Sequence, residues 1–174
     1  YTILKYEKVT NHDVKAIEYY VKEVINNNFI EFKTRSSMVH FGLTSQDVNN
    51  VAFSLMMQDA TTKVMVIEIE KIVSKLNELA TKWSKVVMIT KTHGQPAVPS
   101  TLGKEIRVFI DRISKQLTEL KDLNLTTKFG GAVGNFNAHY CAYPHNDWIN
   151  FADNFVKSLD MERQQHTTQI EHYD

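Results

Sequence analysis

The sequence contains one cysteine, Cys141, and only three prolines and six glycines in 174 residues. A single cysteine excludes a disulfide within the chain, so a reducing compartment is the simpler inference and we expect the cytoplasm. Neither sign of charge is in excess, because the sequence has 20 basic and 20 acidic residues. A general surface for nucleic acid or for an anionic membrane needs a basic excess, so the composition argues against both.

Signals for membrane insertion, secretion and metal binding are missing as well. No apolar run approaches the ~20 residues of a transmembrane helix, and the first residues have no signal-peptide character. The seven histidines form no His-Glu-x-x-His pattern, and one cysteine cannot build a thiolate zinc site. We therefore expect no metal site. No activating partner is visible for Cys141, which argues against a cysteine nucleophile.

The residues that are present describe a globular chain. A hydrophobic content of 43% and a charged content of 23% are typical of a soluble folded protein, and the length suffices for one ordinary domain. The chain begins at Tyr1 rather than at a methionine and stops at Asp174, just after a polar segment. We therefore expect a fragment of a longer protein.

Helical periodicity dominates the chain. Apolar residues spaced three and four apart between Val14 and Val24 predict a helix that Asn11 or His12 starts and 26–28 ends. A second apolar stripe over 102–120 predicts another helix. No strand alternation of useful length is found, so the expected fold class is all-α.

A much longer helix is expected in between. Thr44-x-x-Asp47 fits a capping box, with Ser45 as an alternative cap, and no proline or glycine follows until after Trp83. One helix of that span would be about 55 Å long at ~1.5 Å per residue. Such a helix cannot bury its apolar positions inside a small domain, so we expect it to pack against other subunits.

Two segments near the C-terminal half interrupt the helical pattern. The stretch 129–142 is rich in Gly and Asn but follows a helix rather than a strand, so a tight connection between helices is favoured over a nucleotide-binding loop. After it, Asn146-Asp147 predicts the cap of a short amphipathic helix that ends near Leu159.

The segment 92–101 is interpreted as a rigid loop that presents His93. Gly94 permits a tight turn beside the imidazole, while Pro96 and Pro99 fix φ and disfavour helix before them. A histidine held at a fixed geometry suits proton transfer. The alternative is a structural loop in which the histidine is incidental.

Two polar clusters are candidates for binding an anion. Thr44 and Ser45 stand where the long helix begins, and unpaired N–H groups at a helix start suit a carboxylate or phosphate, although capping alone also explains both hydroxyls. A second cluster starts the first helix: Asn11, His12 and Asp13. His40 precedes Thr44 closely enough to serve the same pocket, with an ordinary hydrogen-bonded role as the alternative.

Five blocks in order carry a resemblance over nearly the whole chain: Thr10–Ala16, Val39–Asp47, Thr92–Thr101, Gly130–His139 and Thr167–Glu171. Together they resemble the adenylosuccinate lyases, a family of the fumarase/aspartase superfamily. Argininosuccinate lyase and fumarase are the alternatives within the superfamily, but those favour Thr-His-Leu-Gln where this chain has Thr-His-Gly-Gln-Pro. A helical oligomerisation module without catalysis is the alternative from another class.

The resemblance implies an enzyme that releases fumarate by β-elimination from adenylosuccinate and from the succinyl-carboxamide intermediate of purine synthesis, without a cofactor. It implies a homotetramer, and the balanced composition argues against a nucleic-acid or membrane partner. It also implies an elongated all-α bundle, in which 1–43 end an N-terminal helical domain and 44–174 form the first part of the central helical-bundle domain.

The resemblance implies site residues as well. His93 would be the general acid that protonates the departing nitrogen, and Thr44 and Ser45 would hold the succinyl carboxylates. The other substrate-binding residues would be Asn11, His12, Asp13, His40 (near the nucleotide phosphate), Thr92 and Gln169.

Two parts of the family pattern are not matched. The family's general base, a serine within Ser-Ser-x-Met-Pro-x-Lys-x-Asn, has no counterpart in this sequence. After Gln169-Ile170-Glu171 the family pattern continues Pro-His-Asp, whereas this chain continues with 172–174 as His-Tyr-Asp.

Overall fold

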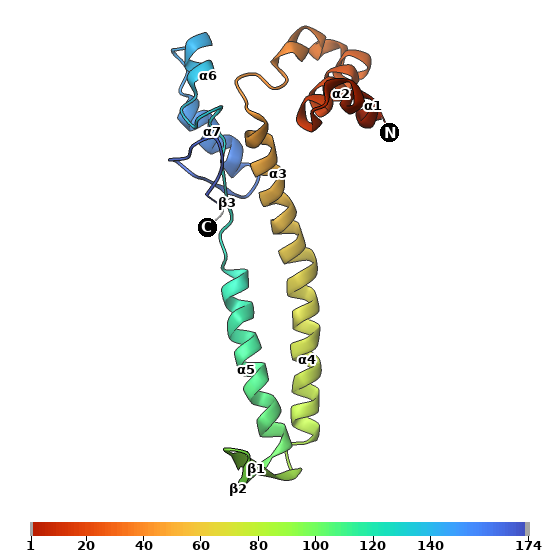
Figure 1. The fold of residues 1–174 in the computed structure, drawn as a ribbon, viewed down its shortest axis with the longest axis vertical. Helices are drawn as coiled ribbons and strands as arrows, with labels where there is room; N and C mark the ends of the chain where they lie inside the picture. The colour runs from red at the N-terminus through yellow and green to blue at the C-terminus, as the bar shows by residue number, and fades with distance from the viewer. Residues whose placement is uncertain (1, 173–174) are drawn as a thin grey trace. The chain divides into compact units, whose positions relative to one another are not determined.

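The computed structural model describes residues 2–172, and the chain divides into two compact units. One unit combines Tyr1–Leu55 with Asn124–Asp174, and the other is Met56–Leu123. Most of the described residues are helical, which confirms the predicted all-α class (Figure 1). The helices are α1 (Thr2–Thr10), α2 (Asp13–Asn28), the 3-10 helix η1 (Ile30–Met38), α3 (Ser45–Ala60), the π-helical turn η2 (Thr61–Met65), α4 (Val66–Lys82), α5 (Leu102–Lys121), α6 (Asn137–Ala142) and α7 (Trp148–Lys157).

The first predicted helix is confirmed as α2. His12 is its N-cap, with extended backbone and with Nδ1 accepting a hydrogen bond from the Lys15 N–H. Glu18 is buried on this helix between two lysines one turn away on either side, Lys15 and Lys22. Burial by itself would raise the pKa of Glu18, but the hydrogen bonds from the two ammonium groups and their charges together lower it below its usual value.

The predicted long helix is also confirmed, with one local difference. The backbone stays helical from Ser45 to Lys82, and Trp83 ends the run as the C-cap of α4. The π-helical turn η2 separates α3 from α4. It was not predicted, because every residue in 61–65 is also compatible with α-helix.

The prediction of a rigid loop at 92–101 is wrong, because this segment contains regular strand structure. The chain forms an antiparallel hairpin of β1 (Val87–Thr92) and β2 (Gln95–Thr101). His93 and Gly94 make the two-residue turn with φ of 53° and 76°, a pair of left-handed residues that matches the twist of a hairpin. Both strands are edge strands, so prolines within β2 remove no hydrogen bond that a central strand would need.

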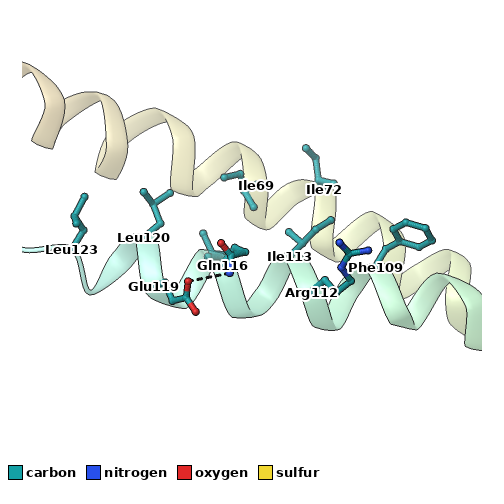
Figure 2. Close-up of a pocket in the computed structure, with 10 residues that line it drawn as sticks. Ile69, Ile72, Phe109, Arg112, Ile113, Gln116, Glu119, Leu120 and Leu123 are labelled. Atoms are coloured by element: carbon teal, nitrogen blue, oxygen red, sulfur yellow. Dashed lines mark hydrogen bonds between the residues drawn. The ribbon is translucent and has the colours of Figure 1, made fainter. Parts of the chain in front are cut away.

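Helices α4 and α5 form the body of the second unit (Figure 1). Thr101 caps α5 by accepting from the Lys104 N–H at 3.3 Å. Gly103 lets the start of α5 approach closely, since a Cβ there would lie 2.3 Å from the Ala80 carbonyl oxygen. Farther along, the two helices border an apolar groove of about 860 Å³, with Ile72, Phe109 and Leu120 among its lining residues (Figure 2).

The hydrophobic core of the first unit gathers around α7. Its buried members are Phe129, Phe136, Trp148, Ala152, Val156 and Met161. Asp147 caps α7 by accepting from the Asn150 N–H, as the sequence predicted. The Gly- and Asn-rich stretch contains the short helix α6 as well as the expected turn. Nearby, two short strands pair in parallel, β3 (Thr126–Thr127) with β4 (Glu162–Arg163).

Within residues 2–172, no helix is both long enough and apolar enough to cross a membrane.

Candidate functional site

A direct contact joins two of the predicted substrate-binding residues. Ser45 is the first residue of α3, and its Oγ lies 3.3 Å from Nε2 of His12, the N-cap of α2. The two residues are 33 positions apart in sequence. The His12 side chain is 49% exposed, so a ligand can reach this pair from solvent.

The His12 ring has polar neighbours at both nitrogens. Nδ1 accepts from the Lys15 N–H at 3.3 Å and also lies 3.3 Å from Asp13 Oδ1. Nε2 lies 3.3 Å from Ser45 Oγ, and the direction of that hydrogen bond depends on which ring nitrogen carries the proton. The contact places a hydroxyl and an imidazole next to each other at the start of α3.

Local helix geometry accounts for both neighbours of His12. Asn11 adopts a left-handed backbone with φ of 51°, and its N–H donates to the Glu7 carbonyl at 2.8 Å, an arrangement that ends α1 as such residues commonly do. Asp13 is the first residue of α2, and its Oδ1 accepts from the Val14 N–H. Both side chains are exposed, so neither role prevents contact with a ligand.

Thr44 and His40 lie in the segment that leads into α3. The Thr44 N–H donates to Asp47 Oδ2 at 2.9 Å, which is one half of the predicted capping box. His40 adopts a left-handed backbone with φ of 70°, and its carbonyl accepts from the Leu43 N–H. Its side chain is half-buried.

The remaining predicted residues lie elsewhere. Thr92 and His93 belong to the other compact unit, at the exposed tip of the β1–β2 hairpin. Gln169 is exposed in an irregular segment of the first unit. The departure from the family pattern at 172–174 falls mostly on Tyr173 and Asp174, which lie outside the described residues.

An ion pair that the sequence did not reveal involves Asp47, which accepts from the Thr44 N–H in the first turn of α3. Lys128 Nζ is 2.7 Å from Asp47 Oδ1, and both side chains are fully buried. Asp47 also accepts from the backbone N–H groups of Gly130 and Gly131. The sequence predicted Asp47 only as part of the capping box. An acidic residue three positions after an N-cap is common in ordinary helices, so this spacing does not indicate a buried ion pair.

His139 is a second buried polar residue near this pair. It is 2% exposed and packs against the rings of Phe41, Phe136 and Trp148, with centroids 4.9 to 5.5 Å away. A Cβ on Gly42 would lie 2.5 Å from its ring. In the part of the chain that the structure describes, its Nδ1 has no hydrogen-bond partner. Burial lowers the pKa of His139, against the opposing charge of Asp47.

We expect the stability of the whole protein to fall between pH 7 and pH 5 through His139. Because its pKa is lower folded than unfolded, the unfolded chain binds more protons in this range, and stability present above about pH 6.5 is lost as the pH falls. The loss is at most about 1.4 kcal/mol per pH unit. Urea unfolding midpoints at several pH values measure it.

His139→Leu, which keeps an apolar side chain against the same rings, removes the titrating group and should flatten this pH dependence. The matched control is His145→Leu, a substitution at an exposed histidine, which should leave the slope as it is in the unsubstituted protein. Equal slopes in both variants would exclude His139 as the cause.

Among residues 2–172, no three His, Cys, Asp or Glu side chains are grouped so that they could hold a metal ion.

Comparison with known protein families identifies the class of protein. A family model described as "Lyase" matches residues 2–174, and the chain belongs to this family.

Curated relatives are more specific. The chain is 44% identical over 176 residues to the adenylosuccinate lyase of Dictyostelium discoideum and 42% identical over 172 residues to that of Haemophilus influenzae. Each alignment covers 99% of this chain but 38% of the relative. The chain therefore spans well under half the length of the curated relatives it matches.

A solved structure shows the same fold. The fumarate lyase from Mesorhizobium sp. BNC1 superposes with a TM-score of 0.78 at 18% sequence identity, covering 95% of this chain and 37% of that one. At this identity the similarity establishes the fold alone.

Proposed function

We propose that the whole protein is an adenylosuccinate lyase, which eliminates fumarate from adenylosuccinate and from the succinyl-carboxamide intermediate of purine synthesis. The observation that carries the proposal is identity of 42–44% to two adenylosuccinate lyases along 99% of the chain. The substrates are small purine nucleotides, and we propose the cytoplasm as the compartment. We also propose that an N-terminal helical domain ends at residue 43 and that the central helical bundle starts at residue 44.

His93 is the proposed general acid. The elimination breaks a C–N bond, and the departing nitrogen needs a proton because its anion is a poor leaving group. The hairpin turn fixes the backbone of His93 at its exposed tip, which suits a residue that must reach a substrate. Thr92, beside it at the end of β1, is proposed to contact the same substrate.

Thr44 and Ser45 are the proposed anchors of the succinyl carboxylates. The start of α3 supplies N–H groups and the positive end of the helix dipole, both of which favour an anion. The contact between Ser45 and His12 places an imidazole beside this anchor. Further substrate contacts are proposed for Asn11, Asp13, His40 and Gln169.

The base that removes the carbon-bound proton is not assigned to these residues. The family's serine signature does not occur in the 174 residues, and the relatives are longer than this chain. We propose that the base lies in the remainder of the whole protein, so the 174 residues alone are expected to release no fumarate.

A direct assay tests the proposed function. The whole protein, supplied with adenylosuccinate, should convert it to AMP and fumarate, followed by ultraviolet absorbance. The double substitution Thr44→Ala/Ser45→Ala should raise KM while the protein remains folded by circular dichroism. A well-folded whole protein with no turnover of adenylosuccinate would refute the proposal, and turnover of argininosuccinate or fumarate instead would assign another lyase of the superfamily.

A homotetramer is proposed from the long helices. Several large apolar side chains of α4 and α5 are more than 40% exposed, including Ile67, Ile72 and Phe109. Exposed apolar surface of this extent commonly marks an interface, and the groove in Figure 2 lies on the same helices. Helices from further copies of the chain are the proposed occupants.

Phe109→Glu should shift the whole protein from tetramer to smaller species, because a carboxylate would be desolvated where an apolar ring is expected to pack. Phe109 is 57% exposed within the second unit, so the substitution leaves the fold of that unit largely unaffected. Sedimentation velocity measures the assembly state. Lys115→Glu, at an exposed site on the same helix, is the control, and an unchanged tetramer in the Phe109 variant would contradict the proposed interface.

A further inference from the structure

Building on the proposed lyase function, we propose that Asp47 is a positioning residue. Its carboxylate holds Thr44 and Ser45 at the start of α3 against the Gly130–Gly131 turn, with Lys128 as its counter-charge. Through this connection Asp47 sets the affinity for the carboxylates of the substrate, without touching the substrate itself.

The first support is the number of groups that converge on one carboxylate. Oδ2 accepts from the Thr44 N–H at 2.9 Å and from the Gly131 N–H at 3.0 Å. Oδ1 accepts from the Gly130 N–H at 2.9 Å and lies 2.7 Å from Lys128 Nζ. An ionised carboxylate only accepts hydrogen bonds and has about four sites for them. No other side chain of this size could serve all these donors.

The second support is burial. The side chains of Asp47 and Lys128 are both 0% exposed. Water therefore does not compete for the bonds, and the low local dielectric strengthens them. A buried ion pair often adds little net stability compared with apolar residues of the same volume. What this pair does provide is a fixed geometry between segments 81 residues apart in sequence.

The third support is steric and comes from the other side of the turn. Gly131 has φ of 79°, and a Cβ there would lie 3.1 Å from the Gly42 carbonyl oxygen. Gly42 stands two residues before Thr44 in the segment that enters α3. The Gly130–Gly131 turn thus contacts the segment that precedes α3, and it also donates hydrogen bonds to Asp47 in the first turn of that helix. Together these contacts leave the backbone of Thr44 and Ser45 little room to move.

The position of the helix start affects how tightly a carboxylate binds. The two hydroxyls can bind a carboxylate well only if the helix start keeps its position, because misplacing a binding group by about 1 Å can cost ~100-fold in rate. Asp47→Asn replaces one acceptor oxygen with an NH₂ group, which opposes the backbone N–H donors. The start of α3 then loses part of its attachment while its own hydroxyls remain.

The test uses the whole protein and compares the two products as inhibitors. Fumarate carries the carboxylates that Thr44 and Ser45 are proposed to hold, whereas AMP lacks them. In Asp47→Asn we expect the inhibition constant for fumarate and the KM for adenylosuccinate to rise about tenfold or more, with the AMP inhibition constant within about twofold of the unsubstituted protein. Asp59→Asn, an exposed acid on the same helix, is the matched control and should change none of these constants.

A second variant separates positioning from stability. Asp47→Asn/Lys128→Met removes both buried charges, so no charge is left unpaired, and its thermal unfolding midpoint should exceed that of Asp47→Asn. The weak fumarate binding should persist, because the carboxylate that holds the Thr44 N–H is still absent. If Asp47→Asn does not fold, this variant decides the question alone.

Parallel weakening of fumarate and AMP, or fumarate binding unchanged in a folded variant, would overturn the positioning role. If the unsubstituted protein shows no turnover of adenylosuccinate, the proposed function and this inference both fail. An active unsubstituted protein whose variants miss the expected pattern refutes the inference alone.

Discussion

Substituting His93 with Gln is expected to lower kcat of the whole protein by about 10²–10⁴-fold, the usual cost of losing a general acid. Glutamine keeps the size and a hydrogen-bonding group but has no proton to transfer at neutral pH. KM for adenylosuccinate should change much less, because His93 is proposed to act on the departing nitrogen rather than to anchor the carboxylates. Steady-state kinetics at saturating substrate measures both constants.

Because His93 is exposed, the substitution should affect catalysis far more than stability. The side chain is at the tip of the hairpin and outside any buried core, so the thermal unfolding midpoint should fall only by the small cost of placing glutamine in the left-handed backbone of the turn. His145→Gln is the matched control, since His145 is also exposed but is not assigned to the site, and it should keep full turnover. A stable His93→Gln protein with unchanged kcat would remove His93 from the mechanism.

Substituting Lys128 with Met is expected to destabilise the whole protein by about 3–5 kcal/mol, because it leaves the Asp47 charge buried without its partner. The lysine is 0% exposed and donates to the Gly131 carbonyl as well as pairing with Asp47. Methionine has a similar length and fills the same space, so a cavity contributes little to the loss. Urea unfolding followed by circular dichroism measures the change.

The same substitution at a surface lysine provides the control. Lys71 pairs with Glu68 on α4 while 66% exposed, and such pairs contribute about 0–1 kcal/mol. Lys71→Met should therefore be close to neutral. Similar losses in the two variants would mean that burial of the Asp47–Lys128 pair is not what makes Lys128 important.

Helices α2, α5 and α7 and the long helical run from Ser45 to Lys82 could be predicted from the sequence because their signals are local, whereas α1, η1 and α6 were not predicted. The spacing of apolar residues determines one face of a helix, and residues such as Thr101 and Asp147 cap the chain segment in which they stand. Among the candidate residues, Thr44 and Ser45 were placed at a helix start for the same reason, and the structure has α3 beginning at Ser45. Their roles in substrate binding remain predictions.

The hairpin at 87–101 escaped prediction because its signals conflict. Prolines usually argue against strands, and here Pro96 and Pro99 lie opposite Lys91 and Ile89 in an irregular two-stranded ladder. The turn residues held the better clue. His93 and Gly94 are both types that tolerate a left-handed backbone, as a two-residue hairpin turn requires.

By itself, the sequence determined the helical class, the approximate bounds of four helical segments and the family resemblance, since each depends on residues close together in the chain or on ordered blocks. Only the tertiary structure decided which distant groups meet. The contact of His12 with Ser45 and the pairing of Asp47 with Lys128 join segments 33 and 81 residues apart. Local patterns carry no information about such contacts, because they depend on how whole elements pack and on which polar groups must be satisfied once they are buried.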